Sequence, residues 1–76
     1  MYNYDKLRGK IIEKYRTNGN FANALNISER TLSLKLNNQI DFKQTEILKI
    51  IKLLSLEIKD IQDYFFKLKV QDIETF

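Results

Sequence analysis

Apolar residues recur at helical spacing along most of the chain, and polar turn residues separate the runs. The first run predicts a helix from about Asp5 to Tyr15, because its apolar residues follow one another at i, i+4, i+5 and i+8. These residues are Leu7, Ile11, Ile12 and Tyr15. The polar run 16–20 should break this helix, and the apolar residues from Phe21 to Leu25 predict a second, very short helix that depends on tertiary contacts.

A third helix is predicted to begin after Ser28, because serine is a good N-cap. Asn26 suits the left-handed conformation that commonly ends the preceding helix. Leu32 and Leu36 mark the buried side of the third helix, and the pair Asn37–Asn38 should end it. The spacing therefore predicts two short helices joined by a turn of about three residues.

Two more helices and an extended segment complete the predicted organisation. The amphipathic run from Glu46 to Leu54 predicts a fourth helix, preceded by Phe42 as a core residue, and a fifth helix is expected from about Lys59 to Phe65. Residues 66–71 alternate apolar and polar, which is typical of a strand, and a lone strand needs a partner. The fold class is thus all-α: a compact five-helix domain at 1–66 with a short extended C-terminal tail at 67–76.

Composition limits the chemistry that this domain is expected to perform. A chain of 76 residues with 43% apolar composition makes one small domain. It has no Cys and no His, so disulfides, thiolate metal sites and the commonest general base are missing. We find no catalytic, cofactor or metal set and expect no enzyme. Apolar runs are short and no signal-peptide stretch begins the chain, so we expect a cytoplasmic protein without a membrane partner.

Charge is distributed unevenly along the chain. Residues 1–52 contain ten Lys and Arg against five Asp and Glu, whereas residues 53–76 contain three against five. A basic N-terminal part fits a nucleic-acid-binding face, and the acidic remainder fits a partner surface. Random scatter of surface charge is the alternative.

The third helix carries the clearest functional pattern. With Leu32 and Leu36 facing inward, 100° per residue turns four residues outward, with Glu29 and Thr31 on the flanks. The four are Arg30, Ser33, Leu34 and Asn37. The arginine, serine, threonine and asparagine of this helix are short or fork-shaped hydrogen-bonding side chains, which suit base edges and phosphates.

These residues resemble the Cro/repressor-type, XRE-like helix-turn-helix family of phages. The likeness rests on small Ala22, on the apolar turn residue Ile27 before Ser28, and on the core pair Leu32 and Leu36. The whole chain looks like the small Cro-like lytic-switch regulators, of the modulator-of-repression type, in temperate phages of Gram-positive bacteria. Further segments that carry this likeness are 2–9, 28–33, 64–66 and 69–71. Asn replaces the Gly that many relatives have at position 26, and it tolerates the same left-handed conformation.

The resemblance implies site residues. It assigns base contacts to Glu29, Arg30, Thr31, Ser33 and Leu34, and phosphate contacts to Asn18, Asn20 and Asn37. Lys14 and Arg16 lie near the motif and Lys43 lies where the fourth helix begins, so we add them as backbone contacts.

Several of these residues have plainer interpretations. Arg30 can pair bidentately with guanine, which makes it the strongest candidate. Glu29 can instead serve the helix macrodipole, Asn20 can cap the second helix, and Asn37 can simply stop the third. Lys35 is expected on the protein side of its helix.

Two functions remain open at this point. In the first, helix 29–37 reads an operator in double-stranded DNA and the protein is a transcriptional regulator of a lysis/lysogeny switch. In the alternative, the same surface binds the phage lysogeny repressor and alters its operator binding. A homodimer through the tail is also open, since its apolar residues can pair across a two-fold axis or fold back onto the core. These residues are Phe65, Phe66, Leu68, Val70, Ile73 and Phe76.

Overall fold

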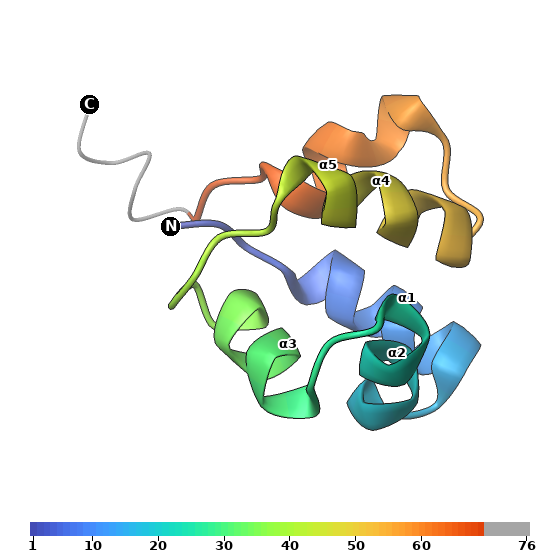
Figure 1. The fold of residues 1–76 in the computed structure, drawn as a ribbon. Helices are drawn as coiled ribbons and strands as arrows, with labels where there is room; N and C mark the ends of the chain where they lie inside the picture. Colours follow the sequence, from blue (N-terminus) through green and yellow to red (C-terminus); the bar gives the residue numbers. More distant parts are fainter. Residues whose placement is uncertain (70–76) are drawn as a thin grey trace.

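The computed structural model describes residues 1–69, which form five α-helices and one 3-10 turn (Figure 1). The elements are α1 (Asp5–Tyr15), α2 (Asn18–Leu25), α3 (Glu29–Leu36), α4 (Gln44–Leu53), η1 (Ile58–Asp60) and α5 (Ile61–Phe65). The prediction of an all-α, five-helix domain is confirmed.

The helices surround one apolar core. In Figure 1, α2 and α3 lie at one end, α4 and α5 lie at the other, and α1 lies between them in contact with α2 and α5. Each helix contributes completely or almost completely buried side chains. The largest are Phe21, Phe65, Leu7, Ile11, Leu32, Ile50 and Leu54. Burying one such side chain contributes roughly 1.5–3 kcal/mol, so this core supplies most of the driving force for folding.

The first two helices differ from the sequence prediction in two ways. Ile12 is 48% exposed, so the buried stripe of α1 is narrower than its apolar pattern. The polar run after α1 ends that helix as predicted, but α2 begins within the run, at Asn18 and not at Phe21. Thr17 makes this early start possible: its side-chain oxygen accepts a hydrogen bond from the backbone N–H of Asn20 at 3.0 Å.

The predicted turn residues behave as expected. Asn26 ends α2 in the left-handed conformation, with φ 64°, and Ser28 caps α3. Asn37 is the C-cap of α3, and Asn38 follows with φ 64°. The local chemistry of Asn and Ser therefore determines where α3 begins and ends.

The C-terminal part is less regular than predicted. The expected fifth helix starts with the 3-10 turn η1, and α5 proper covers only Ile61–Phe65. Instead of a strand over 66–71, the described residues contain an isolated antiparallel bridge between Leu68 and Tyr2. Flanking backbone hydrogen bonds run from Asn3 N to Lys67 O and from Lys69 N to Met1 O. The tail thus finds its first partner in the chain's own N-terminus. Among the tail residues of the predicted dimer, Phe65 is 1% exposed and packs into the chain's own core, whereas Phe66 and Leu68 are exposed. The rest of the predicted strand, Val70 and Gln71, and the tail residues Ile73 and Phe76 lie outside the described residues.

Candidate interaction surface of α2 and α3

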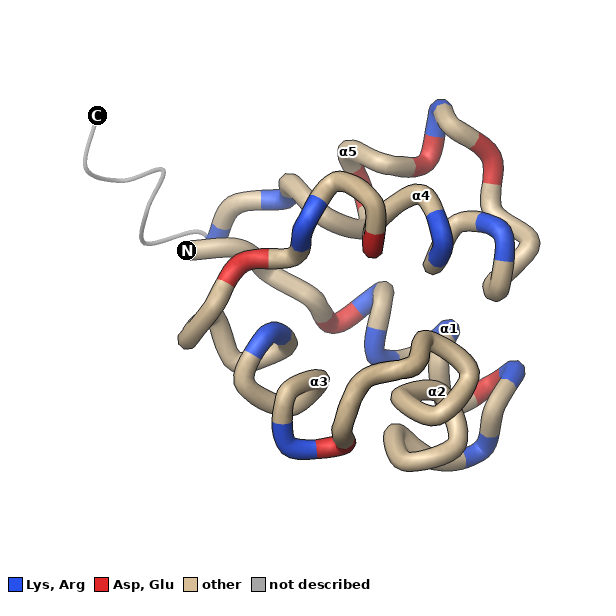
Figure 2. Tube along the Cα trace, viewed as in Figure 1, with Lys and Arg blue, Asp and Glu red and all other residues tan. Residues whose placement is uncertain are grey.

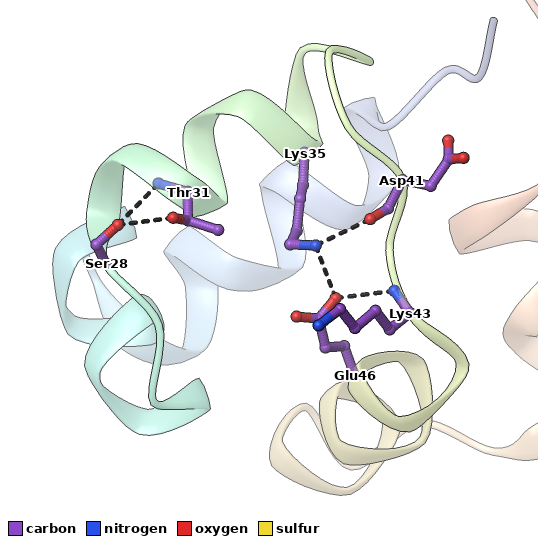
Figure 3. Close-up of polar contacts among 6 residues, drawn as sticks. All are labelled: Ser28, Thr31, Lys35, Asp41, Lys43 and Glu46. Atoms are coloured by element: carbon purple, nitrogen blue, oxygen red, sulfur yellow. Dashed lines mark hydrogen bonds and ion pairs between the residues drawn. The ribbon is translucent and has the colours of Figure 1, made fainter.

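The start of α3 is held by a compact hydrogen-bonded cap (Figure 3). The Ser28 side-chain oxygen accepts from the backbone N–H of Thr31 at 3.0 Å, and its hydroxyl donates to the Thr31 hydroxyl at 2.8 Å. Leu32 and Leu36 are 0% and 2% exposed. Because the cap and these two leucines hold α3 from opposite sides, its outer face is presented in one orientation.

The structure brings the predicted base-reading residues onto one helix and leaves most of them accessible. Glu29, Arg30 and Ser33 are exposed, whereas Thr31 and Leu34 are half-buried. Thr31 is already bonded to Ser28, so its hydroxyl takes part in the cap. Arg30 and Leu34 make no hydrogen bond or ion pair within residues 1–69 through their side chains. They are the side chains of α3 best placed to meet a partner.

Asn37, predicted to hold a phosphate, has partners within the chain. Its side-chain oxygen accepts from the Arg8 guanidinium at 2.8 Å, and its amide donates to the Ser33 hydroxyl at 3.3 Å. Arg8 also donates to the Leu36 carbonyl at 3.0 Å. Sequence reasoning missed Arg8, because nothing in the local pattern of α1 distinguishes it from a solvated cation. It ties α1 to the end of α3.

The start of α2 combines two predicted phosphate contacts with an acidic neighbour. Asn20 is exposed and donates to the Tyr15 carbonyl at 2.9 Å, while Asn18 is half-buried. The Glu29 carboxylate lies so close to Gly19 that a Cβ added there would be 2.9 Å from its oxygen. A helix N-terminus favours an anion, and here Glu29 supplies one from within the chain. The helix cap that Asn20 was alternatively expected to make comes from Thr17.

Few positions along α2 and α3 are occupied by charged residues (Figure 2). The whole of α2 contains no charged residue, and α3 exposes one cation, Arg30, beside one anion, Glu29. The predicted backbone contacts Lys14, Arg16 and Lys43 are exposed, but they belong to the end of α1, its C-cap and the N-cap of α4. The residues of α2 and α3 thus expose little charge of their own, but cations from other elements reach the ends of both helices: Arg8 bonds to Leu36 and Asn37, and Lys49 donates to the Leu25 carbonyl.

Behind α3, a buried ion pair joins the helix to α4 (Figure 3). Lys35 is 4% exposed, as its predicted inward orientation requires, and its ammonium lies 2.9 Å from a Glu46 carboxylate oxygen. The ammonium also donates to the Asp41 carbonyl at 2.9 Å. Burial alone would raise the pKa of Glu46, but the hydrogen bond from the Lys43 backbone N–H and the contact with Lys35 outweigh it and lower the pKa.

Two negative findings describe the same part of the chain. Within residues 1–69, no helix is long and apolar enough to cross a membrane. Over the same range, no group of three His, Cys, Asp or Glu side chains gathers as a metal site would require.

The chain matches a family model over residues 1–68, which is most of its length. It belongs to that family, DUF739, whose members are described as proteins of unknown function. Among solved structures, it is similar to the modulator of repression of the temperate bacteriophage TP901-1 from Lactococcus lactis, with 50% identity and a TM-score of 0.77. The match covers 90% of this chain and 95% of the phage protein. No curated protein matches the chain significantly.

The comparisons with known proteins bear on two of the expectations drawn from the sequence. The resemblance to small phage regulators of the modulator-of-repression type is confirmed by the similarity to the TP901-1 protein. The broader assignment to the Cro/repressor helix-turn-helix family stays a prediction.

Proposed function

We propose that this protein modulates phage repression by binding a repressor protein through the surface formed by α2 and α3. The scarcity of charged residues within α2 and α3 is the observation that carries the proposal. Proteins that bind DNA neutralise phosphates with Lys and Arg, and this contribution dominates their affinity. Protein interfaces instead exclude charge from their centre and enrich Arg and large apolar groups. Arg30 and Leu34, flanked by the uncharged α2, fit the second description.

The similar phage protein supports the same conclusion. It is a modulator of repression, and the match covers nearly the whole of both chains. A repressor is the partner that such a name implies, and we extend that partner to this chain. The proposed activity needs no catalytic group, and we place it in the cytoplasm of the bacterial host, where the repressor acts.

The test is a binding titration against the lysogeny repressor encoded on the same genome, followed by calorimetry or size-exclusion chromatography. We expect a complex whose affinity changes less than about tenfold between 50 and 200 mM salt, because the few exposed charges of α2 and α3 leave little attraction for salt to screen. Failure of the two proteins to associate at low salt would overturn the proposal.

A matched pair of substitutions locates the surface. Leu34→Asp places a charge on the outer face of α3, and Leu48→Asp places the same charge on α4, where Leu48 is 52% exposed. Leu34 is outside the core cluster, so both variants should fold. We expect Leu34→Asp to weaken the complex at least tenfold and Leu48→Asp to leave it unchanged. Equal losses would place the repressor elsewhere.

Operator reading is the second candidate function. The observation in its favour is that Glu29, Arg30 and Ser33 are exposed together on one capped helix. In this alternative Arg30 reads a guanine, Thr31 and Leu34 contribute to base contacts, and the asparagines and flanking cations contact phosphates. Those flanking residues are Asn18, Asn20, Asn37, Lys14, Arg16 and Lys43.

Selection of bound fragments from a random duplex pool tests this second function. A DNA reader with several phosphate contacts should lose about 10³ to 10⁵ in affinity between 50 and 200 mM salt. Enrichment of a motif whose guanine preference disappears in Arg30→Ala would establish direct reading. If no sequence is enriched at low salt, this function is excluded.

A further inference from the structure

An aromatic cavity of about 290 Å³ lies away from the α2–α3 surface, where the N-terminal segment, the residues before α4 and the end of α5 meet. Five of its lining residues are aromatic, and one is acidic. They are Tyr2, Tyr4, Phe42, Phe65, Phe66 and Asp41. Pockets for drug-sized ligands occupy roughly 300–1,000 Å³, so this cavity has the size for a single long side chain.

The rings form a continuous series around the cavity. The centroid of Tyr2 lies 5.7 Å from that of Phe66, and the centroid of Tyr4 lies 5.4 Å from that of Phe42, in both cases edge to face. Tyr2 and Tyr4 are 6.1 Å apart, and Phe42 continues to Phe65 at 5.5 Å. Aromatic faces carry negative electrostatic potential, so a ring face that these edge-to-face contacts leave open to the cavity attracts a cation.

Asp41 adds a formal negative charge to this cavity. Its carboxylate makes no hydrogen bond or ion pair within residues 1–69, because Lys35 bonds to its backbone carbonyl instead. Figure 3 shows the carboxylate directed away from Lys35, Lys43 and Glu46. Burial raises the pKa of Tyr4, and the nearby Tyr2 and Asp41 raise the pKa further, as a negative charge close to the phenol should.

No described residue that lines the cavity supplies the opposite charge. Lys35 lies against one of these rings, with its ammonium 5.8 Å from the centre of the Phe42 ring. Glu46 already neutralises that ammonium in the ion pair with Lys35. Among the described residues, the cavity thus combines aromatic rings and a carboxylate with no cationic side chain in its lining.

We propose that this cavity binds the cationic side chain, arginine or lysine, of a partner protein. The inference rests on the proposed function, because the repressor is the protein expected to supply the side chain. The cavity would be a second contact site for the repressor, separate from the α2–α3 surface. The guanidinium or ammonium would lie against the Tyr2 and Phe42 rings with Asp41 as its counter-ion.

Titration with N-acetyl-arginine amide, followed by ring proton–carbon NMR spectra, tests the cavity without any partner. The neutral isostere N-acetyl-citrulline amide is the matched probe, and N-acetyl-leucine amide tests a purely apolar occupant. We expect arginine to shift the Tyr2, Tyr4 and Phe66 signals with an affinity on the order of millimolar, and citrulline to bind severalfold more weakly. Equal binding of arginine and citrulline, or preferential binding of leucine, would overturn the proposal.

Asp41→Asn removes the counter-ion and leaves the backbone carbonyl that Lys35 uses. It should weaken arginine binding about fivefold and leave citrulline binding unchanged. Glu13→Gln removes one negative charge from an exposed position on α1 and should change neither. A loss of arginine affinity that is the same in both variants would mean that net charge and not the cavity attracts the probe, which refutes the proposal.

The two proposals fail separately. If the protein captures the repressor but no cavity ring responds to arginine, the proposed function stands and the cation site is refuted. If arginine binds and no repressor is captured, the cavity has the chemistry described here but its partner protein is a different one, so the link to the repressor is lost.

Discussion

The two junctions of α3 are built from different chemistry. Toward α2, the helix is held by apolar contacts and caps: Leu25, Leu32 and Ala22 are at most 4% exposed, and Asn26 and Ser28 shape the turn. Toward α4, the helix is held through Lys35, which makes a buried ion pair with Glu46 and donates a hydrogen bond to the Asp41 carbonyl, while the Lys43 N–H holds the Glu46 carboxylate in place.

The difference bears on how firmly each junction is held. The stabilisation from burying apolar side chains depends neither on the precise orientation of the groups nor on pH. A buried ion pair, in contrast, stabilises only while both partners are present and charged. We therefore expect the α2–α3 surface to stay intact under conditions that loosen α3 from α4. Four measurements of stability test this contrast.

The largest effect is expected from Leu32→Ala at the apolar junction. Leu32 is 0% exposed, and removing a buried leucine side chain costs about 3 kcal/mol or more. In a domain of this size such a loss lowers the midpoint of thermal unfolding by more than about 10 °C. Circular dichroism measures it. Leu34→Ala is the control and should cost less than about 1 kcal/mol, since Leu34 lies outside the core cluster.

Lys35→Met should follow, with a loss of about 2 kcal/mol in the free energy of unfolding. The substitution leaves the Glu46 carboxylate, 15% exposed, without its ammonium. Adding Glu46→Gln should recover much of the loss, because glutamine still accepts from the Lys43 N–H and carries no charge. Urea unfolding of the single and double variants checks this, and no recovery in the double variant would mean that packing of Lys35 dominates.

Ser28→Ala should cost about 1 kcal/mol, the usual loss for an N-cap. Alanine lacks the side-chain oxygen that accepts from the Thr31 N–H, so the start of α3 should fray. Hydrogen exchange at Thr31 and Leu32 reports this locally. Ser33→Ala is the matched control on the exposed face of the same helix, and an equal cost there would contradict the role of the cap.

The smallest effect concerns pH. The pKa of Glu46 is lower in the folded chain than its ordinary 4.5, so the carboxylate stabilises the fold above that pH. This contribution should be lost as the pH falls through the lowered pKa. Thermal unfolding from neutral to acidic pH should show a smaller loss of stability in Glu46→Gln than in the unmodified protein. Identical pH profiles would assign the acid sensitivity to other carboxylates.

Local sequence predicted the helical elements well where a few neighbouring residues decide the outcome. Asn26 and Ser28 placed the end of α2 and the start of α3, and Leu32 and Leu36 identified the buried side of α3. The start of α2 was predicted too late, because its first turn consists of Asn18, Gly19 and Asn20, which do not have a helical sequence pattern. The cap from Thr17 allows the helix to begin there.

The interaction site was only partly predictable. The outer face of α3 follows from helical periodicity, which is a local property. The contacts between Arg8 and Asn37 and between Glu29 and the start of α2 depend on how separate helices pack, and no spacing in the sequence indicates them. They decide which of the predicted phosphate ligands already have partners within the chain.

By itself the sequence determined that the chain is helical, where α3 lies, and which of its residues face outward, since these depend on hydrophobic periodicity and capping within a few residues. The tertiary structure alone decided that Arg8 bonds to Asn37 at the end of α3, that Lys35 finds its partner in Glu46, and that five aromatic residues line a cavity beside Asp41. The physical reason is that electrostatics and cavities depend on distances between segments far apart in the chain, and packing sets those distances.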